Sequence, residues 1–179
     1  SRCIAASIAS VTAHASSHGA GGFGRNGASS SPASAPCAAS ISLARATFFV
    51  VGWVAERFPA LIREIAGAGH EVASHSHWHR LVYDLTPSEF REDLRRARGA
   101  IEAACGRAVR GFRAPSFSIT ARSLWAFDIL IEEGYEYDAS VFPIRHDRYG
   151  LPAAPLRPFR LTCGAGSLIE VPGTKVMAG

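Results

Sequence analysis

An α/β fold is predicted for the part of the chain that begins at Arg45. Three observations favour it: strand-like and helix-like segments alternate from there on, the strand-like runs are short and apolar, and capping or turn residues separate the segments. Repeated strand and helix units at this spacing indicate parallel strands joined by right-handed crossovers. A chain of 179 residues has room for one domain with a buried core.

The first elements of this domain are predicted from short apolar runs and one helical period. Strands are expected over residues 46–51 and 71–74, and a helix over residues 56–67. The apolar residues expected on one face of that helix are Phe58, Leu61, Ile62 and Ile65. The chain should therefore run strand, helix, strand up to residue 74.

A long helix is predicted from residue 86 to Gly106. Residues 86–89 (TPSE) form a capping box with proline at the first helical position, and Gly106 supplies a C-terminal stop. The apolar stripe expected to pack against the sheet is Phe90, Leu94, Ala97, Ile101 and Ala104.

Later elements are predicted with shorter signals. We expect a third strand over residues 111–113, a helix from Thr120 to about Gly134, a fourth strand over 135–139 and a last strand over 168–171. Prolines mark the region between the last two strands as loop; they are Pro143, Pro152, Pro155 and Pro158.

Residues 1–44 differ in composition from the rest of the chain. They are dominated by Ala, Ser and Gly and contain no Asp or Glu, so that the first acidic residue is Glu56. Such a segment has too few large apolar groups to offset the entropy of ordering it, and we expect it to be disordered. The abrupt change at Arg45 also motivates the hypothesis that residues 1–44 are a frame-shifted or otherwise spurious translation.

Composition excludes several classes of protein. The net charge of +4 comes without a dense Lys/Arg cluster, so nucleic acid is not an expected partner. The uncharged stretch over residues 26–44 is rich in Ser, Pro and Gly, which excludes a membrane span, and the first residues lack the features of a secretory signal. The four cysteines are too far apart for a zinc knuckle and are interpreted as incidental small apolar side chains or free thiols, although a disulfide is not excluded; they are Cys3, Cys37, Cys105 and Cys163.

Two histidines follow the second predicted strand at its carboxyl end. His75 and His79 are four residues apart, and in a helical turn both imidazoles would face one cation. The carboxyl ends of parallel strands are where α/β enzymes gather functional groups, so we expect a metal site here. His77 should point away from the shared face, as a solvent or packing group. Trp78 is expected either to wall the site or to cover the core.

Polar residues also follow the third and fourth predicted strands. Arg113 is expected either to hold a carboxylate in a bidentate pair or to form a structural ion pair. Asp138 is expected either to orient a histidine acid or to cap the loop that follows. Three neighbouring strand ends thus carry candidate functional residues.

These motifs together resemble the polysaccharide deacetylase family, also called carbohydrate esterase family 4 or NodB-like. The motifs that carry the resemblance are residues 46–51 (ATFFVV), 75–79 (HSHWH), 113–117 (RAPSF) and 137–140 (YDAS). Three stretches further resemble the subset associated with bacterial exopolysaccharide and exosortase loci; they are residues 47–83, 113–125 and 138–150. The resemblance covers about residues 45–179.

The resemblance implies a distorted (β/α) barrel that binds zinc or a similar divalent ion and removes N-acetyl groups from a polysaccharide or oligosaccharide. It implies that His75 and His79 bind the metal, that Arg113 positions a catalytic aspartate, and that Asp138 tunes a histidine acid. Residues expected at the substrate are Trp78, Pro115 and Phe117. The subset is bacterial, and the cytoplasm and the periplasm are both open as its location.

The sequence departs from the family in two places. The family's acidic motif, T-F-D-x-[DE], belongs upstream of Arg45, where no acid occurs, and no match to its late L-x-H motif is present. We therefore expect an incomplete barrel with little or no activity. His14 and His18 lie in a segment too loose for a replacement ligand, and His146 and Asp147 better suit substrate contact or structure. The alternatives are a non-catalytic glycan-binding or metal-binding module and a non-functional translated fragment.

Overall fold

The computed structural model describes residues 45–174 of the chain. The expected disorder or spurious origin of residues 1–44, and the predictions for Cys3, Cys37, His14 and His18, therefore fall outside the described residues. Cys105 and Cys163 are free thiols, as predicted. None of the helices in residues 45–174 has the length and hydropathy needed to cross a membrane.

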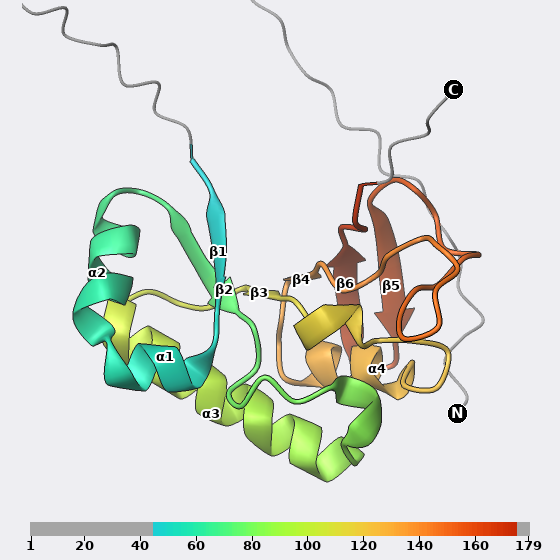
Figure 1. Cartoon of the computed structure of the whole chain (residues 1–179), viewed down its shortest axis with the longest axis horizontal. Helices are drawn as coiled ribbons and strands as arrows, with labels where there is room; N and C mark the ends of the chain where they lie inside the picture. The colour runs from blue at the N-terminus through green and yellow to red at the C-terminus, as the bar shows by residue number, and fades with distance from the viewer. Residues whose placement is uncertain (1–44, 175–179) are drawn as a thin grey trace, which may run out of the picture. The chain divides into compact units, whose positions relative to one another are not determined.

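Six strands form one sheet in the order β1-β2-β3-β4-β6-β5 (Figure 1). Five of them are parallel, and β5 runs antiparallel to β6. Within the described residues, β1 and β5 are the two open edges of the sheet. The predicted α/β class and the incomplete, distorted barrel are confirmed. The strands are β1 (Thr47–Val50), β2 (Glu71–Ser74), β3 (Gly111–Phe112), β4 (Tyr137–Asp138), β5 (Phe159–Cys163) and β6 (Gly166–Glu170).

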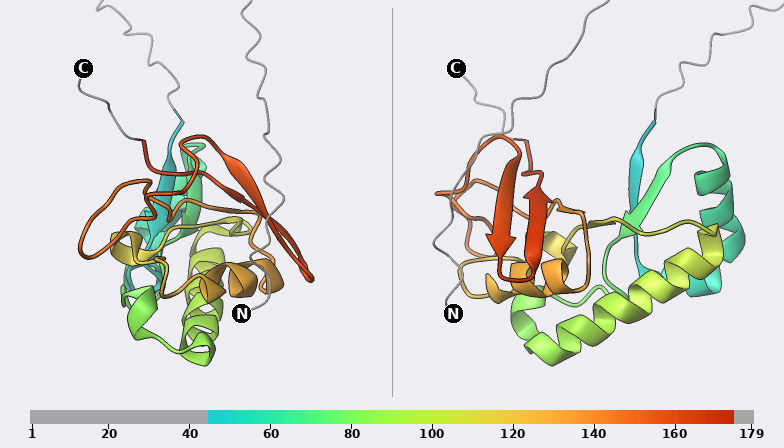
Figure 2. Two further views of the ribbon diagram at one scale, coloured as in Figure 1. Left: turned by 90° about the vertical axis from the view of Figure 1, so that its right-hand side faces the viewer. Right: turned by 180° about the vertical axis from the view of Figure 1, so that it is seen from behind.

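Helices cover this sheet in two groups. Helices α1, α2 and α3 pack on one another, with α2 and α3 against β2 (Figure 1), and α4 lies against the hairpin of β5 and β6 (Figure 2). Two single 3₁₀ turns lie in the loops that follow β2 and β3. The helices are α1 (Gly52–Arg57), α2 (Pro59–Gly67), α3 (Pro87–Cys105) and α4 (Trp125–Glu132), and the turns are η1 (Val82–Asp84) and η2 (Pro115–Phe117).

Helix α3 follows its sequence prediction at both ends and along its length. The Thr86 hydroxyl oxygen accepts a hydrogen bond from the Glu89 amide at 3.3 Å, and the Glu89 carboxylate accepts one from the Thr86 amide at 2.8 Å. Gly106 ends the helix in the left-handed conformation (φ 68°), which costs glycine little. The predicted stripe is buried in full: Phe90, Leu94, Ala97, Ile101 and Ala104.

The helix predicted over residues 56–67 is wrong in its extent. Two helices occupy this region, α1 and α2, and they meet at Phe58, whose backbone is not helical (φ −131°, ψ 55°). Pro59 is the reason, because its ring disfavours the helical conformation of the preceding residue. The predicted face is also only partly buried: Ile62 is enclosed, whereas Phe58 and Leu61 are exposed.

Two later predictions also need correction. Helix α4 begins at Trp125 rather than Thr120, because the Ser123 hydroxyl accepts a hydrogen bond from the Thr120 amide (3.0 Å) and closes a turn before the helix. The region assigned to loop contains β5, whose apolar residues alternate with polar ones behind Pro158. As β5 is antiparallel, the expectation of parallel strands fails there.

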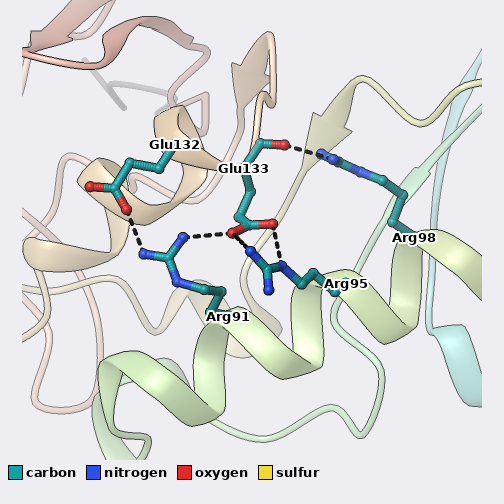
Figure 3. A network of polar contacts seen from close by, with 5 residues as sticks. All are labelled: Arg91, Arg95, Arg98, Glu132 and Glu133. Carbon is teal, nitrogen blue, oxygen red and sulfur yellow. Dashed lines mark hydrogen bonds and ion pairs between the residues drawn. The ribbon is translucent and has the colours of Figure 1, made fainter.

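An ion-pair network ties α4 to α3 (Figure 3). The Glu133 carboxylate accepts hydrogen bonds from Arg91 (2.6 Å) and from two nitrogens of Arg95 (2.8 and 2.9 Å), and Arg91 also pairs with Glu132. Arg98 donates to the Glu133 carbonyl oxygen at 2.6 Å. Such a network fixes two helices relative to each other more firmly than a single exposed ion pair would.

Candidate active site

Three loops at the carboxyl ends of β2, β3 and β4 carry the candidate residues. The sheet pairing continues into them: the His75 amide donates to Val50 O (2.8 Å), the Arg113 amide to Ser74 O (2.9 Å) and the Ala139 amide to Phe112 O (2.9 Å). The loops therefore begin in a fixed register, side by side, as the sequence predicted for the ends of parallel strands.

Backbone strain is concentrated in two of these loops. Within residues 45–174, the non-glycine residues with positive φ are Ser76 (63°), His79 (57°), Ser116 (51°) and Phe117 (52°). Such residues cost about 1–3 kcal/mol each and cluster at functional sites. The Ser76 hydroxyl oxygen holds one of the turns closed by accepting a hydrogen bond from the His79 amide at 2.9 Å.

The imidazoles of His75 and His79 lie side by side, with ring centroids 5.0 Å apart. Nδ1 of His75 is 2.6 Å from Arg113 O, so that Nδ1 carries the proton and Nε2 keeps a free lone pair. Burial lowers the pKa of His75, which keeps this imidazole neutral at pH 7, while His79 is exposed. A neutral imidazole of fixed tautomer is the form that binds a metal ion.

His77 points away from this pair, as predicted, and is completely buried. Its ring lies so close to α1 that a side chain at Gly52 would come within 2.6 Å of His77 Nδ1. Its amide and that of Trp78 donate to the Asp93 carboxylate, at 2.7 and 3.2 Å. His77 is thus a packing group, and Asp93 fastens the histidine loop to α3.

Trp78 does not cover the core, which was one of its two expected positions. Trp78 is half exposed, and the Arg96 guanidinium lies 4.8 Å above its ring. The ring therefore lies over α3 rather than over the core.

Within residues 45–174, Arg113 forms no ion pair, so both of its expected roles stay predictions. Its Nε donates to Ala139 O at 3.1 Å, and its guanidinium stacks on the Phe49 ring at 4.1 Å. No carboxylate of residues 45–174 pairs with it. Arg113 is thus a cation that Ala139 O and the Phe49 ring hold in place.

Asp138 is completely buried beside a second acid, Glu170. The two are register partners on β4 and β6. Asp138 accepts hydrogen bonds from the Ser140 amide (3.0 Å) and hydroxyl (2.6 Å), and Glu170 accepts one from the Val141 amide (3.0 Å). Burial raises the pKa of both carboxyls, and the charge of Asp138 raises the pKa of Glu170 further. Through its bonds to Ser140, Asp138 caps the loop that follows β4.

Pro115 and Phe117 occupy different environments. Pro115 is buried and opens η2, so that it shapes the loop instead of presenting a surface. Phe117 is half-buried and its ring lies near those of Phe142 (5.2 Å) and Tyr149 (6.1 Å). Phe117 thus lies between Arg113, 5.8 Å from its ring, and the aromatic side chains of Phe142 and Tyr149.

The described residues offer no complete metal site. No group of three or more His, Cys, Asp or Glu suited to an ion occurs among them. His146 stacks on Tyr149 and pairs with Asp147 at 2.7 Å, and His70 lies at the amino end of β2, opposite to the pair. His75 and His79 thus stand as two ligand positions.

Sequence reasoning missed Asp93 and Glu170. Asp93 lies on the buried stripe of α3, three residues after Phe90, and an acid in such a stripe signals a buried polar contact. Glu170 is the last residue of β6 and follows two apolar residues, Leu168 and Ile169. What each acid contacts depends on tertiary packing, which the sequence does not reveal.

Comparison with known proteins points to one family. The profile described as polysaccharide deacetylase matches residues 42–135. The chain is 37% identical over 86 residues to a chitooligosaccharide deacetylase of Bradyrhizobium, covering 48% of this chain and 36% of that protein. It is 30% identical over 83 residues to a peptidoglycan-N-acetylglucosamine deacetylase of Bacillus cereus, covering 46% and 30%.

A solved structure extends the likeness to the fold. The crystal structure of a putative polysaccharide deacetylase from Mycobacterium smegmatis has a TM-score of 0.61 and 33% identity, covering 72% of this chain and 40% of that one. The matched region spans about a third of the length of the curated relatives.

Proposed function

This chain belongs to the polysaccharide deacetylase family, and from that premise we propose that it is a metal-dependent hydrolase that removes N-acetyl groups from an amino-sugar polysaccharide. The observation that carries the proposal is the pairing of His75 with His79 at the carboxyl end of the sheet, 5.0 Å apart. The tautomer fixed by Arg113 O supports it, since it leaves the outer nitrogen of His75 free.

The proposed cofactor is a divalent cation, zinc in the first instance, held by His75 and His79. Two neutral imidazoles fit its ligand set, and a catalytic zinc site takes about three protein ligands. When bound, such an ion polarises the acetyl carbonyl and makes water more acidic. The third ligand position is left to a carboxylate outside residues 45–174.

The chain's other residues would supply positioning. Arg113, fixed by Phe49 and Ala139 O, would hold the carboxylate that acts as general base, through the bidentate geometry that guanidinium favours. Asp138, the register partner of Glu170, would orient and tune a histidine that protonates the departing amine. Phe117 and Trp78 would contact sugar, and Pro115 would shape the loop between them.

The chain by itself is proposed to have little activity. Residues 1–44 contain no Asp or Glu, and the described residues provide neither a third ligand nor a base beside the histidine pair. Removing a general base alone costs about 10²–10⁴ in rate.

A chimera tests the function directly. Residues 1–44 are replaced by the segment of the Bradyrhizobium chitooligosaccharide deacetylase that precedes its matched region, and the part of that protein that would carry the late L-x-H motif is joined after residue 174. Acetate release from N-acetylated chitooligosaccharide is then measured with zinc. We expect release that disappears in His75→Ala and His79→Ala and persists in His70→Ala, a control histidine at the other end of β2. A cooperatively folded chimera that releases no acetate would contradict the proposal.

A non-catalytic glycan-binding module is the second candidate, favoured by the incomplete ligand set. Its distinguishing result is saturable glycan binding by the folded chimera without any acetate release.

A further inference from the structure

A pocket lies among the loops that follow the strands carrying the proposed catalytic residues. It has a volume of about 320 Å³ and is lined by three segments: Tyr83 of η1, residues 120–122, and residues 146–150. These segments belong to the loops after β2, β3 and β4, which also carry His75, Arg113 and Asp138. The Ser118 hydroxyl ties two of the loops by accepting a hydrogen bond from the Val82 amide at 2.9 Å.

The loop that forms one wall of this pocket is closed on itself. The amides of Ile144 and Leu151 both donate to Phe142 O, at 2.8 and 2.9 Å. Gly150 has a φ of +105°, and a side chain there would come within 2.3 Å of Ile144 O. The wall is therefore preformed, which reduces the entropy lost when a ligand binds.

Aromatic rings line the pocket and lead back to the arginine loop. Tyr149 stacks on His146 at 4.0 Å, with an interplanar angle of 21°, and lies 6.1 Å from Phe117. Phe117 in turn lies 5.8 Å from the Arg113 guanidinium. Tyrosine offers a flat apolar face and a polar tip, a combination suited to the C–H face and hydroxyl groups of a sugar ring.

Two arginines and one aspartate give the lining of the pocket a net positive charge. Arg122 and Arg148 make no ion pair with the acids of residues 45–174, and Arg122 lies 5.5 Å above the Tyr83 ring. Asp147 is the one acid among the lining residues, and its carboxylate lies 2.7 Å from His146 Nδ1 rather than against either arginine. Free guanidinium groups beside aromatic faces recognise a carboxylate better than a neutral sugar.

We propose that this pocket binds a carboxylate-bearing sugar unit, so that the polysaccharide substrate is acidic as well as N-acetylated. Calling this polysaccharide a substrate rests on the proposed function. The pocket's preference for an acidic sugar is a separate property that does not depend on it. Arg122 and Arg148 hold the carboxylate, and Tyr83 and Tyr149 contact the ring.

Binding to the complete 179-residue chain tests this by calorimetry with two probes. One is a hyaluronan tetrasaccharide, in which N-acetylglucosamine alternates with glucuronic acid, and the other is the neutral tetra-N-acetylchitotetraose. The acidic probe should bind at least about tenfold more tightly, the effect of one charge-assisted hydrogen bond. Its affinity should fall as salt is raised, a readout that needs no variant.

Variants then place the binding in this pocket. Arg122→Gln and Arg148→Gln should each weaken binding of the acidic probe by about tenfold and leave the neutral probe unchanged. Arg157→Gln, an exposed arginine outside the pocket, should change neither. Equal affinity for the two probes, no binding of either, or an effect of Arg157→Gln as large as that of Arg122→Gln would each overturn the proposal. Since no turnover is measured, an inactive chimera that leaves these affinities intact would refute the deacetylase alone.

Discussion

Helix α3 and the histidine loop that packs on it obey different rules. The helix has a capping box, a left-handed glycine at its end and an apolar stripe that is buried throughout. The loop over residues 75–80 has two non-glycine residues at positive φ and a buried histidine ring. One is built as a stable local structure, and the other is held in a costly conformation by its neighbours.

The contrast teaches where the function resides. Local rules are broken in natural proteins at sites where function needs a particular geometry, and the surrounding structure supplies the compensating stability. Here Asp93 of α3 provides that compensation by accepting the amides of His77 and Trp78. Changes in α3 should therefore alter stability, whereas changes at the contact should also disturb the histidine pair.

The largest loss is expected for Phe90→Ala. Phe90 is completely buried and packs on Phe112 and Trp125 with ring centroids 5.7 Å away. Removing a buried phenylalanine costs about 3–5 kcal/mol through lost transfer energy and the cavity left behind. Urea unfolding measures it, and a loss no larger than that of an exposed substitution would show that α3 is not the core of the domain.

The next change, Asp93→Ala, tests the contact between the two regions. It leaves two amides without their acceptor, and each buried unsatisfied group costs about 1–3 kcal/mol. Glu92→Ala, an exposed neighbour without a partner in the described residues, is the control and should be nearly neutral. Asp93→Ala should also shift the NMR signals of the His75 and His79 rings. Unchanged rings would mean that the loop holds its own shape.

Thr86→Ala should have a smaller effect, confined to α3. It removes the hydroxyl that accepts the Glu89 amide, and the loss of such a cap costs about 1 kcal/mol. Urea unfolding should detect it, and the histidine ring signals should not move. Movement of those rings would break the separation between helix and loop.

Glu170→Gln is expected to be silent in acid and stabilising in base. Glu170 has a raised pKa when folded, so the unfolded chain ionises first as pH rises and the folded state loses stability above about pH 5. Glutamine does not ionise, and its amide oxygen can keep the hydrogen bond from the Val141 amide. The melting temperature of the variant should exceed that of the wild type increasingly as the pH rises above about 5. A difference that does not change with pH would mean that folding does not raise the pKa of Glu170.

The features that the sequence predicted are those whose signals lie close together along the chain. Helix α3 was predictable to its caps because its signals lie within four residues of one another. The strand ends and the spacing of His75 and His79 were predictable for the same reason. The break at Phe58 was also predictable, because Pro59 follows it. Strand β5 was not predicted, because the prolines before it indicated a loop.

The features that the sequence did not predict depend on contacts between segments that are distant along the chain. The burial of His77 needs the space left at Gly52, and the contact of Asp138 with Glu170 needs the register of β4 and β6. Neither relation is visible in the order of residues alone. The proposed carboxylate partner of Arg113 and the proposed third metal ligand also depend on contacts between distant segments, because each would come from another part of a barrel.

A zinc titration followed by NMR of the histidine rings, with two-bond hydrogen–nitrogen correlations, tests whether His75 and His79 form one metal site. We predict that Nε2 of His75 and a ring nitrogen of His79 shift together and saturably, that Nδ1 of His75 remains protonated, and that His77 does not respond. Shifts confined to His70 or His146, or the absence of any shift at His75, would mean that His75 and His79 do not bind the metal together.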